Sequence, residues 1–410
     1  MFKQKKTVKL KRSLSFPLLL FYSTGTILGL GIYVILGKIA GHAGMFTPLA
    51  FIVSAILVIF TAFSYSELSA RIPKSGGAVN YVDSAFNIPA LSKIIGWLLV
   101  ASAIISTATV LNGYVGYVHE FVNIAPWIII SLVIVVLSAI VIWGITQSAA
   151  TITVITVIEL LGIFLVIFFA GDNLSQLPAR INEFIPSFEF SVWKGILMGA
   201  FLGFFTFIGF ESAVNVAEET KNPQKNMPRA IIGSLLILTI LYIIVAIIAV
   251  LGLSPQELET SEAPLVDILS QKGLSFPLVI TIIGLIAIIN GVMVQMVMNA
   301  RVLYGMAQRK LAPPIFGKLN RKTRTPIWAT IFSSVVILAF ALAFDLESLA
   351  SATNYILLVV FIFINLSLIV LKKRNKKPKG VRTYSVAVPF LGFFFSIAIL
   401  FFQLYTIFFK

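Results

Sequence analysis

The chain has 410 residues, of which 59% are hydrophobic and only 11% are charged, a balance that excludes an ordinary soluble domain. The formal net charge is +15 and cysteine is absent, so disulfides and thiolate metal sites are excluded as well. Apolar stretches long enough for a helix to cross a bilayer recur along the chain. The sequence therefore predicts an all-α integral membrane protein.

Eleven such stretches are predicted, and they are predicted to be helices because backbone in lipid must satisfy its own hydrogen bonds. No long linker divides them, so residues 1–410 are expected to form one transmembrane domain that follows a basic cytoplasmic tail at 1–14. Short surface helices are expected in the connections at 171–191 and 254–274. The predicted spans are 15–41, 47–70, 92–118, 126–146, 149–170, 192–217, 229–253, 275–300, 326–344, 348–371 and 386–409.

The charged residues mark the two sides of the membrane. If the N-terminus is cytoplasmic, most of the 31 lysines and arginines fall in segments on the inside. The outside connection at 254–274 is acidic instead, with Glu257, Glu262 and Asp267 among its residues. This asymmetry follows the positive-inside rule. The basic excess is thus interpreted as a topology signal in a plasma or inner membrane protein, with lipid rather than nucleic acid as its partner.

Two of the predicted spans contain interruptions. Span 1 contains STGTILGLGIY, whose Gly25, Gly29 and Gly31 weaken a helix. Span 6 contains FLGFFTFIGFESAV, which combines glycines with the acid Glu211. Glycines also serve close helix packing in membranes. However, two broken spans five helices apart predict an inverted-repeat transporter with its site near the midplane. The repeats would cover 15–170 and 192–371, leaving 386–409 as an extra helix.

Four stretches resemble the amino acid–polyamine–organocation family of secondary transporters, whose members share the leucine-transporter fold. The resemblance implies a core of five plus five helices, with broken spans 1 and 6. Many members have twelve or more spans, whereas eleven are predicted here. The four stretches are GTILGLGIY (25–33), YSELSARIPKSGGAVNYV (65–82), FTFIGFESAVNVAEETKNPQKNMPRAI (205–231) and ARVLYGMAQRKLAPPIFGKLNRKTRTPIWAT (300–330).

A broken helix exposes backbone groups that can hold an amino acid. The N-terminus of a half-helix favours an anion, so the N–H groups of Leu30, Gly31 and Ile32 are expected to hold a substrate carboxylate. The resemblance implies that the carbonyls of Ile27, Phe205 and Ile208 face the substrate ammonium, and that Phe205 is a gate. The expected substrate-binding residues are Thr26, Ile27, Gly29, Leu30, Gly31, Ile32, Phe205, Ile208 and Gly209.

Two acids, Glu159 and Glu211, lie deep in predicted spans and are candidates for proton coupling, since intramembrane acids are functional by default. The alternative for each is a structural hydrogen bond to a neighbouring helix. Sodium coupling is disfavoured, because span 8 lacks serine or threonine where sodium-dependent relatives place hydroxyl ligands. With only two histidines in the chain, no metal or cofactor is expected. Candidates for the side-chain pocket, with simple packing as the alternative, are Thr107, Asn290, Met293 and Tyr355.

The leading hypothesis is secondary amino acid transport by alternating access, with proton-coupled uptake of a neutral L-amino acid. The alternatives are an amino acid or amine exchanger and a cationic amino acid or polyamine transporter. A non-transporting sensor or a channel would belong to a different class, but a channel should show a filter or a ring of like charge. No nucleophile–base pair suggests an enzyme.

Overall fold

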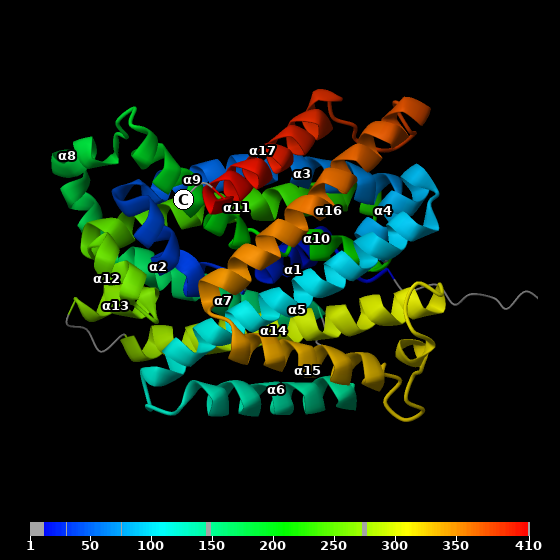
Figure 1. Cartoon of the computed structure of the whole chain (residues 1–410), viewed down its shortest axis with the longest axis horizontal. Helices are drawn as coiled ribbons and strands as arrows, with labels where there is room; N and C mark the ends of the chain where they lie inside the picture. The colour runs from blue at the N-terminus through cyan, green and yellow to red at the C-terminus, as the bar shows by residue number, and fades with distance from the viewer. Residues whose placement is uncertain (1–11, 30, 75, 145–148, 273–276, 409–410) are drawn as a thin grey trace, which may run out of the picture.

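The computed structural model describes residues 12–29, 31–74, 76–144, 149–272 and 277–408. Nearly all of these residues are helical, and long helices cross the molecule from one end to the other (Figure 1). Most of the predicted basic tail lies outside the described residues. The predicted span boundaries at 146, 275 and 409 also lie outside them.

Except for the first and the sixth, each predicted span corresponds to one long helix. These helices are apolar almost throughout. Because lipid offers no hydrogen-bond partners, the backbone N–H and C=O groups bond to each other within each helix. The helices are α3 (Thr47–Arg71), α5 (Pro89–His119), α6 (Pro126–Trp143), α7 (Ala149–Ala170), α11 (Pro223–Gly252), α14 (Pro277–Gln308), α15 (Ile327–Ala343), α16 (Leu346–Arg374) and α17 (Ala387–Phe408).

The first and the sixth spans are interrupted, as predicted. Span 1 consists of α1 (Phe16–Leu28) and α2 (Ile32–Ala43). Span 6 consists of α9 (Phe190–Phe205), the single turn α10 (Phe210–Ala213) and the 3-10 helix η4 (Val214–Glu219). Both breaks fall where the glycines weaken the helix.

Within the described residues, nine helical segments are long and apolar enough to cross a membrane, and two shorter apolar helices, α1 and α15, accompany them. The chain is therefore a multi-pass membrane protein. The count of eleven spans, the single domain and the division into repeats at 15–170 and 192–371 stay predictions.

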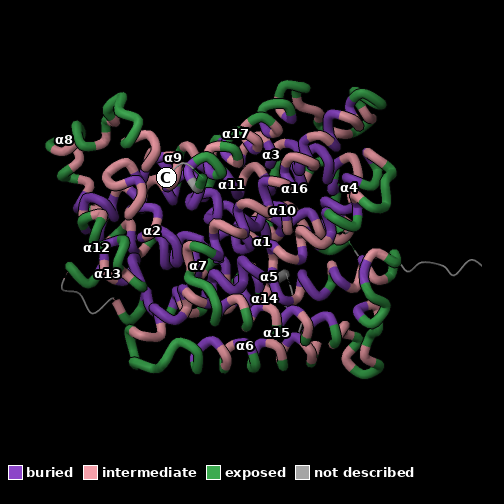
Figure 2. The backbone as a smooth tube through the Cα atoms, viewed as in Figure 1, coloured by how far each residue is buried: buried purple, intermediate pink, exposed green. Residues whose placement is uncertain are grey.

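The interrupted spans lie in the middle of the bundle. Figure 2 shows buried backbone around α1, α9 and α10, whereas α6 lies at the edge with much of its length exposed. The helices α6 and α15 pack side by side there, and the Ser138 hydroxyl donates a hydrogen bond to Ser334 Oγ at 2.7 Å. On the opposite edge, α17 packs against α16 and α3 (Figure 1). The outermost helices thus shield the breaks from lipid.

Short helices cover the two ends of the molecule. Short helices occur in both connections where surface helices are predicted, but most residues of α13 (Pro264–Ser270) are buried. The helix α12 (Pro255–Thr260) begins with a capping box in which Ser254 N donates to Glu257 at 2.7 Å. The helices of both connections lie at the left in Figure 1, at what we call the outer end; the basic segments and α4 lie at the cytoplasmic end. The short helices are η1 (Gly44–Phe46), α4 (Gly77–Phe86), η2 (Gly171–Gln176), α8 (Leu177–Arg180), η3 (Ile181–Phe184), α12 (Pro255–Thr260), α13 (Pro264–Ser270) and η5 (Pro314–Gly317).

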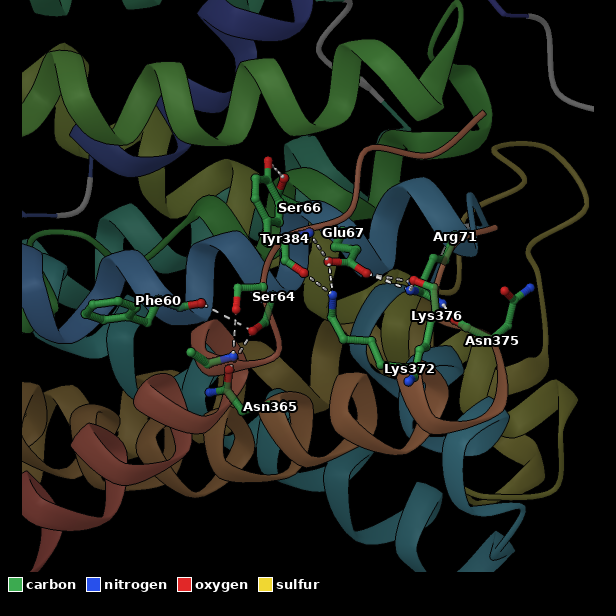
Figure 3. Close-up of polar contacts among 12 residues, drawn as sticks. Phe60, Ser64, Ser66, Glu67, Arg71, Asn365, Lys372, Asn375, Lys376 and Tyr384 are labelled. Atoms are coloured by element: carbon green, nitrogen blue, oxygen red, sulfur yellow. Dashed lines mark hydrogen bonds and ion pairs between the residues drawn. The ribbon is translucent and has the colours of Figure 1, made fainter. Parts of the chain in front are cut away.

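A buried charge cluster ties α3 to α16 at the cytoplasmic end (Figure 3). The fully buried Glu67 accepts hydrogen bonds from Arg71 Nη2 at 2.7 Å and from the Tyr384 N–H at 2.9 Å, and it forms an ion pair with Lys372 Nζ at 2.8 Å. Lys372 Nζ also donates to the Tyr384 carbonyl at 2.6 Å, and Arg71 Nη1 donates to the Asn375 carbonyl at 2.9 Å. The cluster therefore also anchors the connection that leads from α16 to α17.

Candidate functional site

The break in span 1 separates α1 from α2 by three residues. Gly29 N still donates to the Gly25 carbonyl at 3.2 Å, which completes α1. Gly31 has neither helical nor extended dihedrals (φ −120°, ψ −75°) and its carbonyl accepts the Val34 N–H at 3.0 Å, which starts α2. The N-terminus of α2 thus begins at Ile32, as the sequence predicts. Leu30, which was expected to help hold a carboxylate, lies outside the described residues.

The break in span 6 is a tight turn. After α9 ends at Phe205, the N–H of Ile208 donates to the Phe205 carbonyl at 3.1 Å. Gly209 follows with φ +125°, a conformation that side chains with a Cβ rarely adopt. Its N–H donates to Glu211 Oε2 at 2.7 Å. Glu211 therefore caps the start of the second half of span 6. The Phe205 carbonyl, one of the three expected to face the ammonium, already accepts a hydrogen bond.

The two breaks cross each other at close range. A methyl group added at Gly31 would overlap the backbone of Thr206, and one added at Gly209 would overlap the Thr26 carbonyl and crowd Ile27. Glycine is thus needed at both positions because the two backbones approach each other closely. The structure brings together the described residues expected to bind substrate, from Thr26 to Ile32 in one span and from Phe205 to Gly209 in the other. Phe205, the expected gate, is completely buried.

A carboxylic acid and an amide form a hydrogen-bonded pair beside the span 1 break. Asn290 Nδ2 in α14 donates to Glu159 Oε1 in α7 at 2.9 Å, and both side chains are buried. The space that a Cβ on Gly29 would fill is in contact with the same carboxylate oxygen. The Tyr33 hydroxyl donates to the Glu159 carbonyl at 2.7 Å. Within the described part of the chain, Glu159 Oε2 and Asn290 Oδ1 have no hydrogen-bond partner, so this pair can accept a proton or a donor.

A cavity of about 470 Å³ extends from the cytoplasmic end to the span 6 break. Among the expected site residues that the structure describes, Ile208 and Glu211 line it. The expected pocket residues are elsewhere: the Thr107 hydroxyl donates to the Ala103 carbonyl of its own helix at 2.6 Å, and the Tyr355 ring packs on Phe201. Met293 is half-buried against the core. A side-chain pocket formed by these residues stays a prediction.

The outer end is closed over the breaks. The Tyr117 hydroxyl donates to the Tyr33 carbonyl at 2.9 Å, and Lys38 Nζ donates to the Glu259 carbonyl at 2.7 Å, which holds α12 on α2. A methyl group at Gly116 in α5 would overlap the backbone of Glu262. The described part of this connection, 254–272, therefore packs over the outer end. The conformation is open toward the cytoplasmic end and closed at the outer end.

Several polar residues of this cavity were not predicted from the sequence. Gln295 and Asn299 line it from α14, and Ser102 and Ser106 line it from α5. Each pair has the spacing of four residues that places side chains on one helical face. Polar side chains repeated at that spacing inside an apolar span were a signal that could have identified both walls.

Comparison with known proteins agrees with this architecture. The family described as "Amino acid permease" matches residues 14–409. The Branched-chain amino acid permease BcaP of Bacillus subtilis (strain 168) is 28% identical over 412 residues, covering 95% of this chain and 87% of BcaP. The mitochondrial Cationic amino acid transporter 3 of Arabidopsis thaliana is 27% identical and covers 89% of this chain, which spans 63% of that relative's length.

The fold also matches a solved transporter structure. The crystal structure of MhsT in complex with L-phenylalanine has the leucine-transporter fold and superposes with a TM-score of 0.62 at 17% identity, covering 97% of this chain and 99% of MhsT. At this identity the match shows the fold alone. Together with the crossed breaks and the family match over nearly the whole chain, it establishes that the chain belongs to the amino acid permease family of transporters.

Proposed function

We propose that the chain carries a neutral L-amino acid across the membrane by alternating access, coupled to protons. The observation that carries the proposal is the crossing of two broken spans in the middle of the bundle, with the N-terminus of α2 at the crossing. Such a helix end presents N–H groups and a positive dipole to a carboxylate. A carboxylate is common to all amino acids, so the crossing explains the class of substrate rather than its side chain.

Two buried acids support proton coupling. Glu211 lines the cavity and touches the span 6 break through Gly209, so it is reached from the cytoplasmic end. Glu159 lies beside the span 1 break and is sealed from solvent. Charged acids in a low-dielectric interior are costly unless paired, and neither acid has a described cation as its partner. Proton binding at each break would remove that cost.

Uptake of radiolabelled L-leucine into proteoliposomes tests this proposal. We expect faster uptake with an inward proton gradient than with the gradient collapsed. Glu211→Gln and Glu159→Gln should each lose this stimulation and retain counterflow, whereas Glu189→Gln, an exposed acid at the outer end, should keep both. Equal uptake with and without the gradient, while counterflow persists, would refute proton coupling and leave exchange.

The carboxylate site at the crossing has its own test. Gly31→Val should abolish binding of L-leucine, because the added side chain would overlap the Thr206 backbone and force the two breaks apart; a melting temperature equal to that of the wild type would show that the protein remains folded. Gly171→Val, where an added Cβ meets no described atom within 4 Å, is the control. Normal leucine binding by Gly31→Val would contradict the assignment.

A cationic substrate is the second candidate. It is favoured by Glu211, an acid that lines the cavity within reach of the break. It is also compatible with the cationic amino acid transporter among the relatives. Competition of leucine counterflow by L-arginine at the outer face distinguishes the two, since a site for neutral substrates should exclude the guanidinium.

A further inference from the structure

The cavity at the cytoplasmic end is lined by three polar helical faces. Side chains four residues apart share one face of an α-helix, and the walls formed by α14 and α5 show this spacing. The polar residues are Gln295 and Asn299 on α14, Ser102 and Ser106 on α5, and Glu211, Asn215 and Glu219 on the second half of span 6. Such a repeated pattern builds a hydrophilic path into the membrane-spanning part of the protein.

Three side chains in the buried part of this path offer hydrogen-bond acceptors. Asn299 is 2% exposed, and its Nδ2 donates to Ser333 Oγ at 3.1 Å, so the remaining atom is Oδ1. That oxygen has no partner among the described residues. The Ser106 hydroxyl donates a hydrogen bond to the Ala103 carbonyl at 3.2 Å, so the lone pairs of its oxygen are available to accept one. Glu211 adds a carboxylate. A buried acceptor without a donor is costly, so a ligand that supplies donors would be stabilised here.

The basic residues of the cavity do not offset this acceptor excess. Arg301 and Arg309 also line it, but both are exposed, and Arg309 Nη2 already donates to Asn80 Oδ1 at 2.6 Å. Arg309 lies about 15 Å from Asn299 along the helix axis, at 1.5 Å of rise per residue. That separation exceeds the distance between the amine and the carboxylate of one α-amino acid. Arg301 is only two residues from Asn299, but it is exposed and lies about 200° around the helix from Asn299. The buried part of the cavity is thus suited to an amine rather than to a whole zwitterion.

We propose that Glu211, Asn299 and Ser106 form a second binding station, on the cytoplasmic side of the crossed breaks, for a protonated amine. The inference rests on the proposed function, because the amine is that of the amino acid leaving the crossing. At the crossing the N-terminus of α2 binds the carboxylate. At the station the amine is held by acceptors alone, so the ligand needs no carboxylate to bind there.

Putrescine is the probe that separates the two sites. It has two protonated amines and no carboxylate, and its charge keeps it from crossing the bilayer. We expect putrescine at the cytoplasmic face of oriented proteoliposomes to inhibit leucine counterflow, and putrescine at the outer face to have no effect. Equal inhibition from both faces, or no inhibition from either face, would overturn the proposal.

Variants at Asn299 assign the effect to the station. Asn299→Leu should weaken inhibition from the cytoplasmic face about tenfold, the effect of losing one hydrogen bond to a charged group. Asn299→Asp keeps an acceptor and should retain inhibition. The matched control is Asn354→Leu: Asn354 is also buried, donates Nδ2 to the Phe201 carbonyl and has no described partner for Oδ1, but it lies outside the cavity lining. Equal loss in Asn299→Leu and Asn354→Leu would contradict the assignment.

A binding measurement keeps this test independent of transport. Putrescine should raise the melting temperature of the purified protein in detergent, and Asn299→Leu should abolish that shift. If leucine counterflow is absent altogether while the shift is present, the proposed function fails and the amine station stands. If leucine is transported but neither the shift nor the face-specific inhibition occurs, the station fails and the proposed function stands.

Discussion

The charge cluster at the cytoplasmic end gives a sharp test of the packing. Glu67 is fully buried, and its partners Arg71 and Lys372 have side chains that are only 7% and 4% exposed. Replacing Glu67 by Gln keeps the shape but leaves two buried cations without a counter-charge. The glutamine amide would also direct N–H groups at either the Tyr384 N–H or the donors of Arg71 (Figure 3). Removing one partner of a buried pair costs about 3–5 kcal/mol.

The assay is thermal unfolding of purified Glu67→Gln in detergent, followed by tryptophan fluorescence. We expect a clearly lower melting temperature than that of the wild type, and partial recovery in the double variant Glu67→Gln/Lys372→Met, which removes one of the unpaired cations. The control is Glu183→Gln, whose partner Arg180 lies at 2.7 Å but in solvent. An exposed ion pair is screened by solvent and contributes little to stability, so this variant should have the same melting temperature as the wild type.

An unchanged melting temperature in Glu67→Gln would refute the reasoning, because it would mean that the two cations are solvated or repartnered without cost. Equal destabilisation by Glu67→Gln and Glu183→Gln would also contradict it, since burial would then not decide the effect.

Two further predictions concern glycines at which helices approach closely. Gly209→Ala should abolish leucine counterflow, because φ +125° is strained for alanine and the Thr26 carbonyl occupies the space of the methyl group; normal counterflow would show that the crossing can open without cost. Gly116→Val should prevent α5 from packing against Glu262, because the added side chain would overlap the Glu262 backbone, and it should therefore favour the state that is open at the outer end. Accessibility of a cysteine introduced at Tyr33 to an impermeant thiol reagent should therefore rise, and unchanged accessibility would contradict the closure.

Local patterns predicted the helices and both breaks. Hydrophobic length locates spans because lipid leaves the backbone no partner except its own helix. Glycines located the interruptions, since they weaken a helix, and Glu211 marked span 6 as an acid inside an apolar span. The resemblance of four stretches to a family indicated the fold; the match over residues 14–409 confirmed the family, and the superposition with MhsT confirmed the fold.

The sequence could not indicate which polar side chains meet. Asn290 was expected in a side-chain pocket, but it donates to Glu159, which lies 131 positions earlier in the chain. The partners Lys372 and Tyr384 of Glu67 lie more than 300 positions later. Pairs at such separations depend on how helices are arranged, and no local pattern records that arrangement.

By itself, the sequence determined a multi-span helical membrane protein with two weakened spans and a basic cytoplasmic side. Those properties depend on residue type and local spacing alone. The tertiary structure decided that the breaks cross at Gly31 and Gly209, that the cavity reaches Glu211 from the cytoplasmic end, and that the outer end is closed by α12 and its neighbours. The physical reason is that these features arise from contacts between distant helices, whose alternative arrangements differ by only a few kcal/mol in such a protein.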